Sequence, residues 1–186
     1  MDDSNTRGIV FVTVGTTKFD ALIAAVDCAS FAQALTAAGY HTLIIQAGSS
    51  QDYRPHRLLG SPNIQKGIIE TAGVNKASKL SVEWFEYAPS LQQHIGAASL
   101  VISHAGAGSI FETLRLGVPL IAVPNPLLMD DHQRELAERL EVGGWAVAST
   151  VEGLAETVRG LDVGVLKPYV PGDGSGIVRK IDELFG

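Results

Sequence analysis

Short apolar runs rich in β-branched residues recur along this chain, and most end in a turn of Gly, Ser or Thr before a segment with helical spacing. The runs lie at 8–14, 41–46, 80–87, 100–102, 120–123 and 145–148. Such runs are typical of buried parallel strands, and their alternation with helices predicts an α/β fold with a doubly wound, Rossmann-like sheet. Ligands bind these sheets at the carboxyl ends of the strands, so we expect the functional residues in the turns that follow them.

Helical spacing also predicts where the connecting elements lie. Helices are expected over 19–38, from Pro89 to 97, from the Gly-rich turn at 106 to 117, from 130 or 131 to 141, and over 150–159. Ile68 and Ile69 predict a short strand within an otherwise irregular segment. A Pro/Gly-rich stretch, 167–176, separates a last amphipathic helix at 177–185. We therefore expect a domain over residues 1–164, followed by a linker and helix over 165–186.

Composition excludes several classes of protein. A length of 186 residues fits one domain, and a net charge of −6 gives no general attraction to nucleic acid or to an anionic membrane. The single cysteine, Cys28, excludes an internal disulfide and is expected to be buried. Residues 1–5 are acidic and polar, unlike a secretory signal, and no run approaches the ~18 apolar residues of a membrane span. We expect a soluble, cytoplasmic chain that reaches a membrane only through a partner, without inserting itself.

The segment 103–113 carries the most chemistry. Gly106, Ala107, Gly108 and Ser109 form a turn of small residues that lets a ligand approach the backbone, and the helix that follows presents free amides to a phosphate. Glu112, one turn into the helix, is placed to accept from a sugar hydroxyl. This layout predicts a nucleotide-diphosphate site; the alternative is a tight packing turn, with His104 as a packed histidine.

The same segment departs from a dinucleotide-binding fingerprint. Phe111 stands at the third glycine position, and the motif follows a late strand rather than the first. A nicotinamide-dependent dehydrogenase is therefore not expected. The chain also lacks a phosphate loop with Lys-Ser/Thr, a Gly-x-Ser-x-Gly elbow and paired cysteines, which excludes kinases, common hydrolases and zinc modules.

Two further loops fall at the same end of the predicted sheet. Gly15, Thr16 and Thr17 can contact phosphate or sugar oxygens, or they form an ordinary turn with a Thr cap. The segment Asp131-His132-Gln133 can hydrogen-bond sugar hydroxyls from a helix start, or it is a capped helix with exposed polar residues. Asp130 and Asp131 without further ligands are weak evidence for a metal. No metal and no other cofactor is expected.

In combination, these loops resemble a known family. The segments 12–17, 44–48, 103–110, 115–121 and 128–133 resemble the soluble catalytic subunits of two-part UDP-N-acetylglucosamine transferases of the dolichol pathway. More distantly, the chain is similar to the carboxyl-terminal domains of peptidoglycan N-acetylglucosaminyltransferases and other GT-B enzymes of the family 28 type. The resemblance implies the donor-binding half of a GT-B fold, paired in a heterodimer with a membrane-anchored subunit that supplies the acceptor domain.

The resemblance also implies an activity. N-acetylglucosamine would pass from UDP to dolichyl-diphosphate-N-acetylglucosamine, with inversion, at the cytosolic face of the endoplasmic reticulum, forming the lipid-linked chitobiose of N-glycan synthesis. Gly106–Ser109 would hold the diphosphate and Glu112 the ribose, while His132 and Gln133 face the donor sugar and Phe85 lies by the uracil. The C-terminal helix would help to dock the partner.

Several alternatives remain open at the level of sequence. The catalytic base is His104, His132 or a group of the partner, because an imidazole titrates near neutral pH. A polysaccharide-synthesis transferase subunit with glucose or galactose as donor sugar would share the same motifs. A non-catalytic nucleotide-sugar-binding module is the alternative from a different class.

Overall fold

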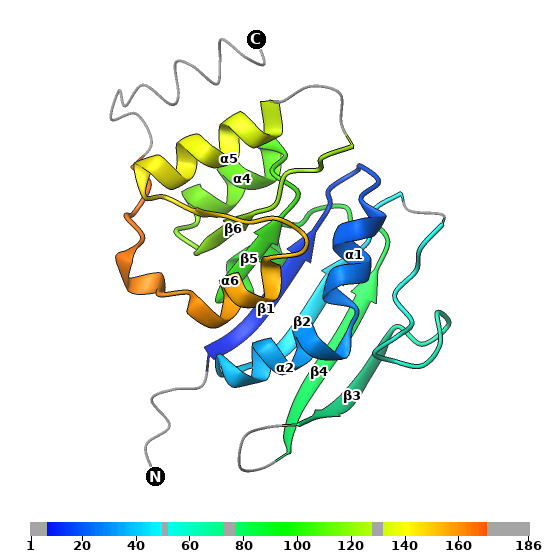
Figure 1. The fold of residues 1–186 in the computed structure, drawn as a ribbon. Helices are drawn as coiled ribbons and strands as arrows, with labels where there is room; N and C mark the ends of the chain where they lie inside the picture. The colour runs from blue at the N-terminus through cyan, green and yellow to red at the C-terminus, as the bar shows by residue number, and fades with distance from the viewer. Residues whose placement is uncertain (1–6, 50–51, 73–76, 128–131, 171–186) are drawn as a thin grey trace.

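The computed structural model describes residues 7–49, 52–72, 77–127 and 132–170 as one sheet with helices on both faces (Figure 1). The strands are β1 (Arg7–Thr13), β2 (Tyr40–Gln46), β3 (Lys66–Thr71), β4 (Ser78–Phe85), β5 (Leu100–Ser103), β6 (Leu120–Ala122) and β7 (Val147–Ala148). The helices are α1 (Asp20–Val26), α2 (Ala29–Ala37), α3 (Gln92–Ala97), α4 (Ala107–Arg115), α5 (His132–Gly143) and α6 (Leu154–Gly160), with a 3-10 turn at Val163–Val165.

The topology confirms the predicted α/β class. The sheet has seven strands in the order β3-β4-β2-β1-β5-β6-β7, and every pairing is parallel except that of β3 with β4. The chain proceeds outward from β1 through β2 to β4, then returns to place β5 on the other side of β1. The direction of winding therefore reverses between β1 and β5, and this is the place where doubly wound sheets bind ligands.

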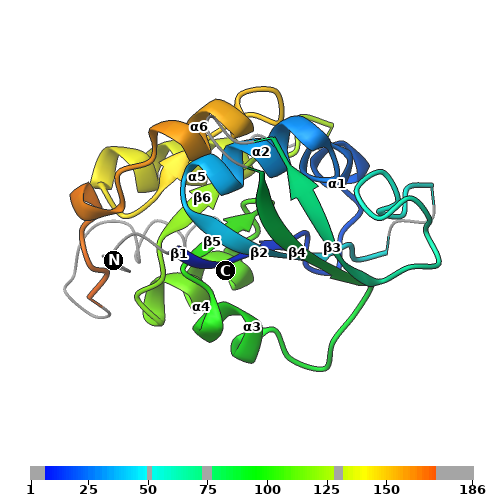
Figure 2. The ribbon, with the colours of Figure 1, turned by 90° about the horizontal axis from the view of Figure 1, so that it is seen from below.

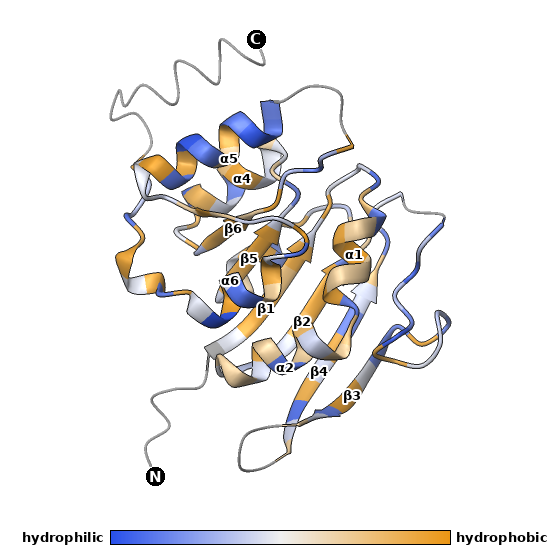
Figure 3. Cartoon of the chain, viewed as in Figure 1, coloured by the Kyte–Doolittle hydropathy of each residue, from blue (hydrophilic) through white to orange (hydrophobic). Residues whose placement is uncertain are grey.

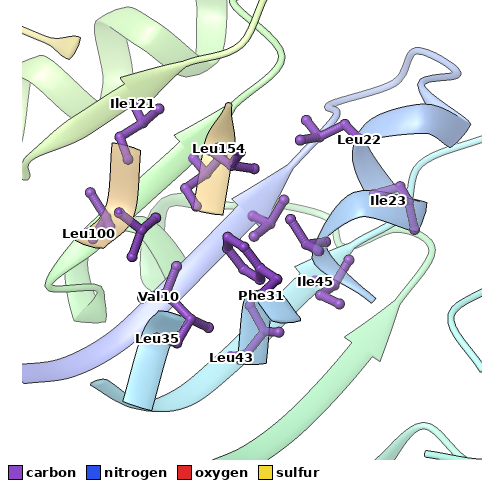
Figure 4. Packing of buried hydrophobic residues seen from close by; sticks show 14 of the residues in the cluster. Val10, Leu22, Ile23, Phe31, Leu35, Leu43, Ile45, Leu100, Ile121 and Leu154 are labelled. Carbon is purple, nitrogen blue, oxygen red and sulfur yellow. The ribbon is translucent and has the colours of Figure 1, made fainter. Parts of the chain in front are cut away.

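Two hydrophobic cores cover the two faces of the sheet. On β1, Val10 and Val12 face the core under α1, α2 and α6, whereas Phe11 faces the core under α3, α4 and α5, as the alternation of a strand requires. Figure 2 shows α2 and α6 on one side of the sheet and α3 and α4 on the other. Hydrophobic residues follow the central strands (Figure 3), and Phe31 of α2 points toward β1 and β2 (Figure 4).

The prediction of one helix over 19–38 is wrong, because the chain breaks it at Asp27. The Asp27 side chain is only 1% exposed, and its carboxylate accepts hydrogen bonds from the Tyr53 hydroxyl and from three backbone amides at 56–58, at 2.8–3.0 Å. Cys28 adopts an extended conformation, and α2 then starts afresh. A buried carboxylate needs such donors, so the long-range contact overrides the local helical spacing.

Other boundaries also differ from expectation. The predicted short strand at Ile68 is a six-residue edge strand, β3, which pairs antiparallel with β4; this hairpin also starts β4 at Ser78 rather than Leu80. Helix α3 begins at Gln92 rather than Pro89, since the Gln92 amide donates to the Ser90 hydroxyl at 3.2 Å. Helix α6 begins at Leu154, not at 150.

The described part of the C-terminal segment runs beside α5. The Lys167 amide donates to the Gly144 carbonyl at 2.8 Å, and Tyr169 packs on the core under α4 and α5. The predicted helix at 177–185 and most of the Pro/Gly-rich stretch lie outside the described residues, and the boundary at residue 164 stays a prediction. Across the described residues, no single helix is long and apolar enough to cross a membrane; only the bent pair of α1 and α2 together reaches that length and composition.

Candidate functional site

The turns after β1 and β5 meet at the carboxyl end of the sheet, where its winding reverses (Figure 1). The His104 amide donates to the Thr13 carbonyl at 3.2 Å, which extends the pairing of the two strands by one residue. Gly15 follows β1 directly, and the Gly106–Ser109 turn follows β5. The structure therefore brings together the two Gly-containing turns that are separated by about half of the chain.

The His104 ring is wedged between these turns. An ideal Cβ placed on Gly106 would lie 2.2 Å from the His104 Nε2, and one on Gly15 would lie 3.0 Å from the His104 Cε1. The side chain is 6% exposed, and its Nδ1 lies 3.4 Å from the Thr13 carbonyl oxygen, which calls for the tautomer that donates from Nδ1. Burial lowers the pKa of His104, so the neutral ring is favoured.

The backbone turns sharply directly after His104, at a residue in a strained conformation. Ala105 has a φ of 61°, in the left-handed region that residues with a Cβ rarely adopt, and it is buried. This conformation reverses the backbone direction within one residue. Helix α4 can therefore start immediately after β5, with its N-terminus directed at the crevice.

Helix α4 begins with free donors. Gly106 is the N-cap residue and provides no side chain, and the first intrahelical bond runs from the Ile110 amide to the Gly106 carbonyl at 3.1 Å. The amides of Ala107, Gly108 and Ser109 therefore have no helical carbonyl to donate to. Gly108 is exposed and the other two are half-buried. Three donors at the positive end of the helix dipole suit an anion.

Glu112 stands one turn above these donors. It lies three residues after Ser109 and four after Gly108, which places it on the same side of α4. Its side chain is half-buried, and no ion pair joins it to another described residue. A carboxylate in this place can accept from hydroxyl groups of a ligand bound at the helix start.

The turn after β1 is held in a specific conformation. Gly15 has a φ of 59°, and its amide donates to the Thr13 hydroxyl at 3.0 Å. The Thr17 hydroxyl donates to the Val14 carbonyl at 2.8 Å and is therefore occupied as a donor, although its oxygen can still accept. Thr16 is exposed. Of the two threonines, Thr16 is the one whose hydroxyl can donate to a ligand.

A buried amide that the sequence did not reveal joins the turns. The Gln46 side chain, at the end of β2, donates to the carbonyls of Gly15 and Glu86 and accepts from the Thr13 hydroxyl. The sequence offers one signal for it, since Gln46 is a polar residue directly after an apolar run. Only the structure shows which loops it contacts.

The loop after β6 carries the third predicted group of residues. The Gln133 Oε1 accepts from the Asn125 amide at 3.0 Å, while the Asn125 side chain donates to the Lys18 carbonyl, 3.4 Å away in the turn after β1. This chain of contacts links Gln133 to the first turn and commits its amide oxygen. Within the described part of the chain the Gln133 Nε2 makes no hydrogen bond, so it can donate to a ligand. His132 is half-buried at the start of α5, and Asp131 lies outside the described residues.

Phe85 lies at the end of β4, on the face of the sheet that α3 covers. Its ring is 4.8 Å from the His94 ring and 6.4 Å from the Phe11 ring, centroid to centroid. Residue 85 is paired with Gln46 of β2. The side chain is thus part of an aromatic cluster, and its placement beside a nucleobase stays a prediction.

A cavity of about 690 Å³ lies between α5 and the loop before α6, and Asn125 and Gln133 contribute to its lining. Three hydroxyl groups in its lining have hydrogen-bond partners: Ser149 and Thr157 are 2.8 Å apart, Thr157 also donates to the Gly153 carbonyl, and Thr150 accepts from the Gly153 amide. No residue of the Gly15 turn or of the Gly106–Ser109 turn lines the cavity. Within the described ranges, no three His, Cys, Asp or Glu side chains gather as they would around a metal ion.

Comparison with known proteins agrees with this geometry. The family model for the glycosyltransferase family 28 C-terminal domain matches residues 9–170. The chain is 41% identical over 135 residues to the UDP-N-acetylglucosamine transferase subunit ALG13 of Homo sapiens, which covers 73% of this chain and 10% of the human protein. It is 36% identical over 192 residues to the subunit of the same name from Saccharomyces cerevisiae, with 95% of each chain covered. The chain thus spans about a tenth of the human relative and nearly all of the yeast one.

Solved structures show the same fold. The solution NMR structure of ALG13 superposes with a TM-score of 0.69 at 26% identity, with 98% of each chain covered. The crystal structure of Acinetobacter baumannii MurG superposes with a TM-score of 0.58 at 20% identity, with 86% of this chain and 40% of that chain covered. The fold is that of one half of a GT-B glycosyltransferase, as the sequence predicted.

Proposed function

Because the chain belongs to the glycosyltransferase family 28 C-terminal domain family, as an ALG13-like UDP-N-acetylglucosamine transferase subunit, we propose that it binds UDP-N-acetylglucosamine and transfers the sugar together with a membrane-anchored partner subunit. The proposed acceptor is dolichyl-diphosphate-N-acetylglucosamine at the cytosolic face of the endoplasmic reticulum. The product is the lipid-linked chitobiose of N-glycan synthesis. The observation that carries the proposal is the set of free amides at the start of α4, which lies beside the Gly15 turn and one helical turn from Glu112.

The donor is proposed to lie across the carboxyl end of the sheet. The amides of Ala107–Ser109 hold the diphosphate, and the Glu112 carboxylate accepts from the ribose hydroxyls. Thr16 and the Gly15 turn approach the phosphates from the other side of the crevice, and the uracil lies by the end of β4 near Phe85. Gln133, with Nε2 as donor, faces the donor sugar with His132 and Asp131.

This arrangement suits departure of UDP. Negative charge develops on the diphosphate as the bond to the anomeric carbon breaks, and preorganised amides stabilise that charge more in the transition state than in the ground state. Loss of one such donor typically costs ~10²–10³ in rate. Because these amides belong to the backbone, the site needs no excess of positive side chains, in accord with the net charge of −6.

Of the two histidines, His132 suits the role of general base better. Inversion requires attack by the acceptor hydroxyl from the face opposite UDP, so the base must be open to the acceptor side. His104 is buried and bonded to the Thr13 carbonyl, which suits a positioning role between the two turns. His132 is half-buried at the start of α5. A group of the partner is the remaining candidate.

A transfer assay tests the proposal. Labelled UDP-N-acetylglucosamine and dolichyl-diphosphate-N-acetylglucosamine are supplied to this chain alone and to the chain co-expressed with its membrane-anchored partner. We expect negligible transfer alone and clear transfer together, since the chain is half of the GT-B fold. Full activity of the isolated chain would refute the division of labour between two subunits.

Calorimetric titration separates the alternatives in donor and in class. Tighter binding of UDP-N-acetylglucosamine than of UDP-galactose is expected, and the reverse order would favour a polysaccharide-synthesis subunit. Donor binding without transfer in the presence of the partner would favour a non-catalytic module. No binding of either nucleotide sugar, together with no transfer, would refute the proposed function.

A further inference from the structure

We propose that Gln46 is a positioning residue that fixes the distance between the phosphate end and the base end of the donor site. The inference rests on the proposed function, because it takes the Gly15 turn and the end of β4 to contact opposite ends of one nucleotide. Gln46 itself is 1% exposed and is not expected to touch the donor. Its effect on binding must therefore pass through the two loops that it joins.

The contacts of Gln46 reach both loops at once. Its Nε2 lies 2.8 Å from the Gly15 carbonyl oxygen and 2.8 Å from the Glu86 carbonyl oxygen, so the two amide protons are divided between the loops after β1 and β4. Its Oε1 accepts from the Thr13 hydroxyl at 2.6 Å, and that hydroxyl accepts from the Gly15 amide at 3.0 Å. The first turn is thus held through both its carbonyl and its amide.

Only an amide of this length fits the three partners. Two carbonyl oxygens require two donors from one atom, while the Thr13 hydroxyl requires an acceptor on the neighbouring atom, and this pattern fixes which end of the amide is nitrogen. A carboxylate would place an oxygen against two carbonyl oxygens, and an apolar side chain would leave both buried carbonyls without a donor. The residue is therefore specific in chemistry as well as in size.

The two loops are those that the proposed donor would bridge. The Gly15 turn lies against the His104 ring, which in turn lies against Gly106 at the start of α4. Glu86 follows Phe85, and its carbonyl also accepts from the Gly48 amide at 3.1 Å. A ligand that contacts both loops depends on their separation, whereas a ligand that contacts one loop does not.

Affinities for UDP and for uridine distinguish this role from simple stabilisation. Gln46→Glu keeps the shape and the acceptor but loses both donors, and Thr13→Val is a second variant that removes the hydroxyl while leaving Gln46 in place. By NMR titration at low temperature, we expect the Kd for UDP to rise about tenfold in Gln46→Glu, while the Kd for uridine changes less than about twofold. Thr13→Val should shift the ratio in the same direction by a smaller amount.

The control is Thr71→Val. The Thr71 hydroxyl is buried and bonded to the Thr36 hydroxyl at 2.9 Å, but it lies at the opposite end of the sheet, where β3 meets the start of β4. Its loss should lower stability and leave both affinities unchanged. Equal changes for UDP and uridine in Gln46→Glu, or no change in either, would overturn the proposal.

A readout without ligand separates failure of the inference from failure of the proposed function. In the free protein, Gln46→Glu should speed amide hydrogen exchange at Gly15 and at Gly48 together, and Thr71→Val should not. If wild-type protein does not bind UDP, the proposed function fails and the donor role of Gln46 fails with it. If wild-type protein binds UDP but exchange at the two glycines is unchanged in Gln46→Glu, the inference alone is overturned.

Discussion

Replacing Gly106 or Gly108 with alanine separates the packing role of the Gly-rich turn from its role in binding. At Gly106, an added Cβ would meet three atoms of the His104 ring at 2.2, 2.6 and 3.1 Å, whereas ordinary contacts lie beyond about 3.4 Å. The ring would have to move by ~1 Å. Its retreat is limited by Gly15 on the other side and by the bond from Nδ1 to the Thr13 carbonyl.

The cost of Gly106→Ala is therefore steric. The φ of −73° at Gly106 is ordinary for alanine, so no backbone strain adds to it. Overpacking of this kind costs ~1–3 kcal/mol. For a chain of this size, each kcal/mol lowers Tm by ~2–4 °C, so we expect a loss of ~2–12 °C. UDP binding should weaken as well, because displacement of His104 disturbs both turns.

Gly108→Ala should have the opposite effect on stability. Nothing lies within 4 Å of its added Cβ, and alanine favours a helix over glycine by up to ~1 kcal/mol. We expect Tm to be unchanged or slightly raised. The methyl group would nevertheless stand where the diphosphate is proposed to approach the amides, so the Kd for UDP should rise at least about tenfold.

Differential scanning fluorimetry and calorimetric titration of both variants provide the measurements. The informative result is the combination, in which Gly108→Ala keeps its stability and loses affinity. Wild-type affinity in Gly108→Ala would refute the placement of the diphosphate over this helix start. A wild-type Tm in Gly106→Ala would refute the inference that the His104 ring is immobilised between the two glycines.

Three further predictions concern single side chains. Glu112→Ala should raise the Kd for UDP about tenfold but leave the Kd for 2′,3′-dideoxy-UDP unchanged, because only the ribose hydroxyls need the carboxylate; equal losses for both ligands would remove Glu112 from that role. Burial lowers the pKa of His104 below 6.5, so as pH falls the unfolded chain binds a proton at this residue before the folded chain does. The free energy of unfolding should therefore decrease below pH 6.5, by at most ~1.4 kcal/mol per pH unit. His104→Asn keeps a donor toward the Thr13 carbonyl but does not titrate, so it should reduce this pH dependence of the unfolding free energy in urea titrations at pH 7.5, 6.5 and 5.5. An unchanged pH dependence would mean that other groups cause it. In the same titrations, Asp27→Asn should lower the free energy of unfolding by ~2–4 kcal/mol, because four donors lose a carboxylate acceptor. The control Asp52→Asn, at an exposed carboxylate, should lower it by less than ~1 kcal/mol. Similar losses in both variants would contradict the buried role of Asp27.

The parts of the fold that the sequence predicted are those decided locally. Buried strands such as β1 and β5 show as apolar runs, and the Gly117 that ends α4 has a φ of 68°, which glycine adopts without strain. The break at Asp27 was missed because apolar spacing continues through it, and the donors that stabilise it come from a loop about 30 residues later. The sequence predicted only a short part of the antiparallel edge strand β3 for a similar reason, because its length and register are set by its pairing with β4.

In the candidate site, too, the residues that sequence could identify are those whose role depends on local properties. Gly106, Gly108 and Glu112 could be found from sequence because backbone access and helical spacing are local properties. The role of Gln46 could not be found in this way, because its partners lie at the end of β1, in the turn after β1 and in the loop after β4, and a single polar residue at the end of β2 gives no indication of them. His104 was considered for chemistry because histidine titrates near neutral pH, yet its position between two glycines depends on the pairing of β5 with β1.

These contacts bear on how the donor would bind. The turns after β1, β4 and β5 are each tied to a buried polar side chain, and the loop after β6 is tied to the first turn through Asn125 and Gln133. Loops that are already ordered lose little conformational entropy on binding. Donors that are already aligned need little reorganisation as charge develops on the leaving group. The groups that provide this order are buried, so in an alignment of sequences they would resemble core residues. Binding measurements with paired ligands, rather than stability alone, are therefore needed to recognise them as part of the donor site.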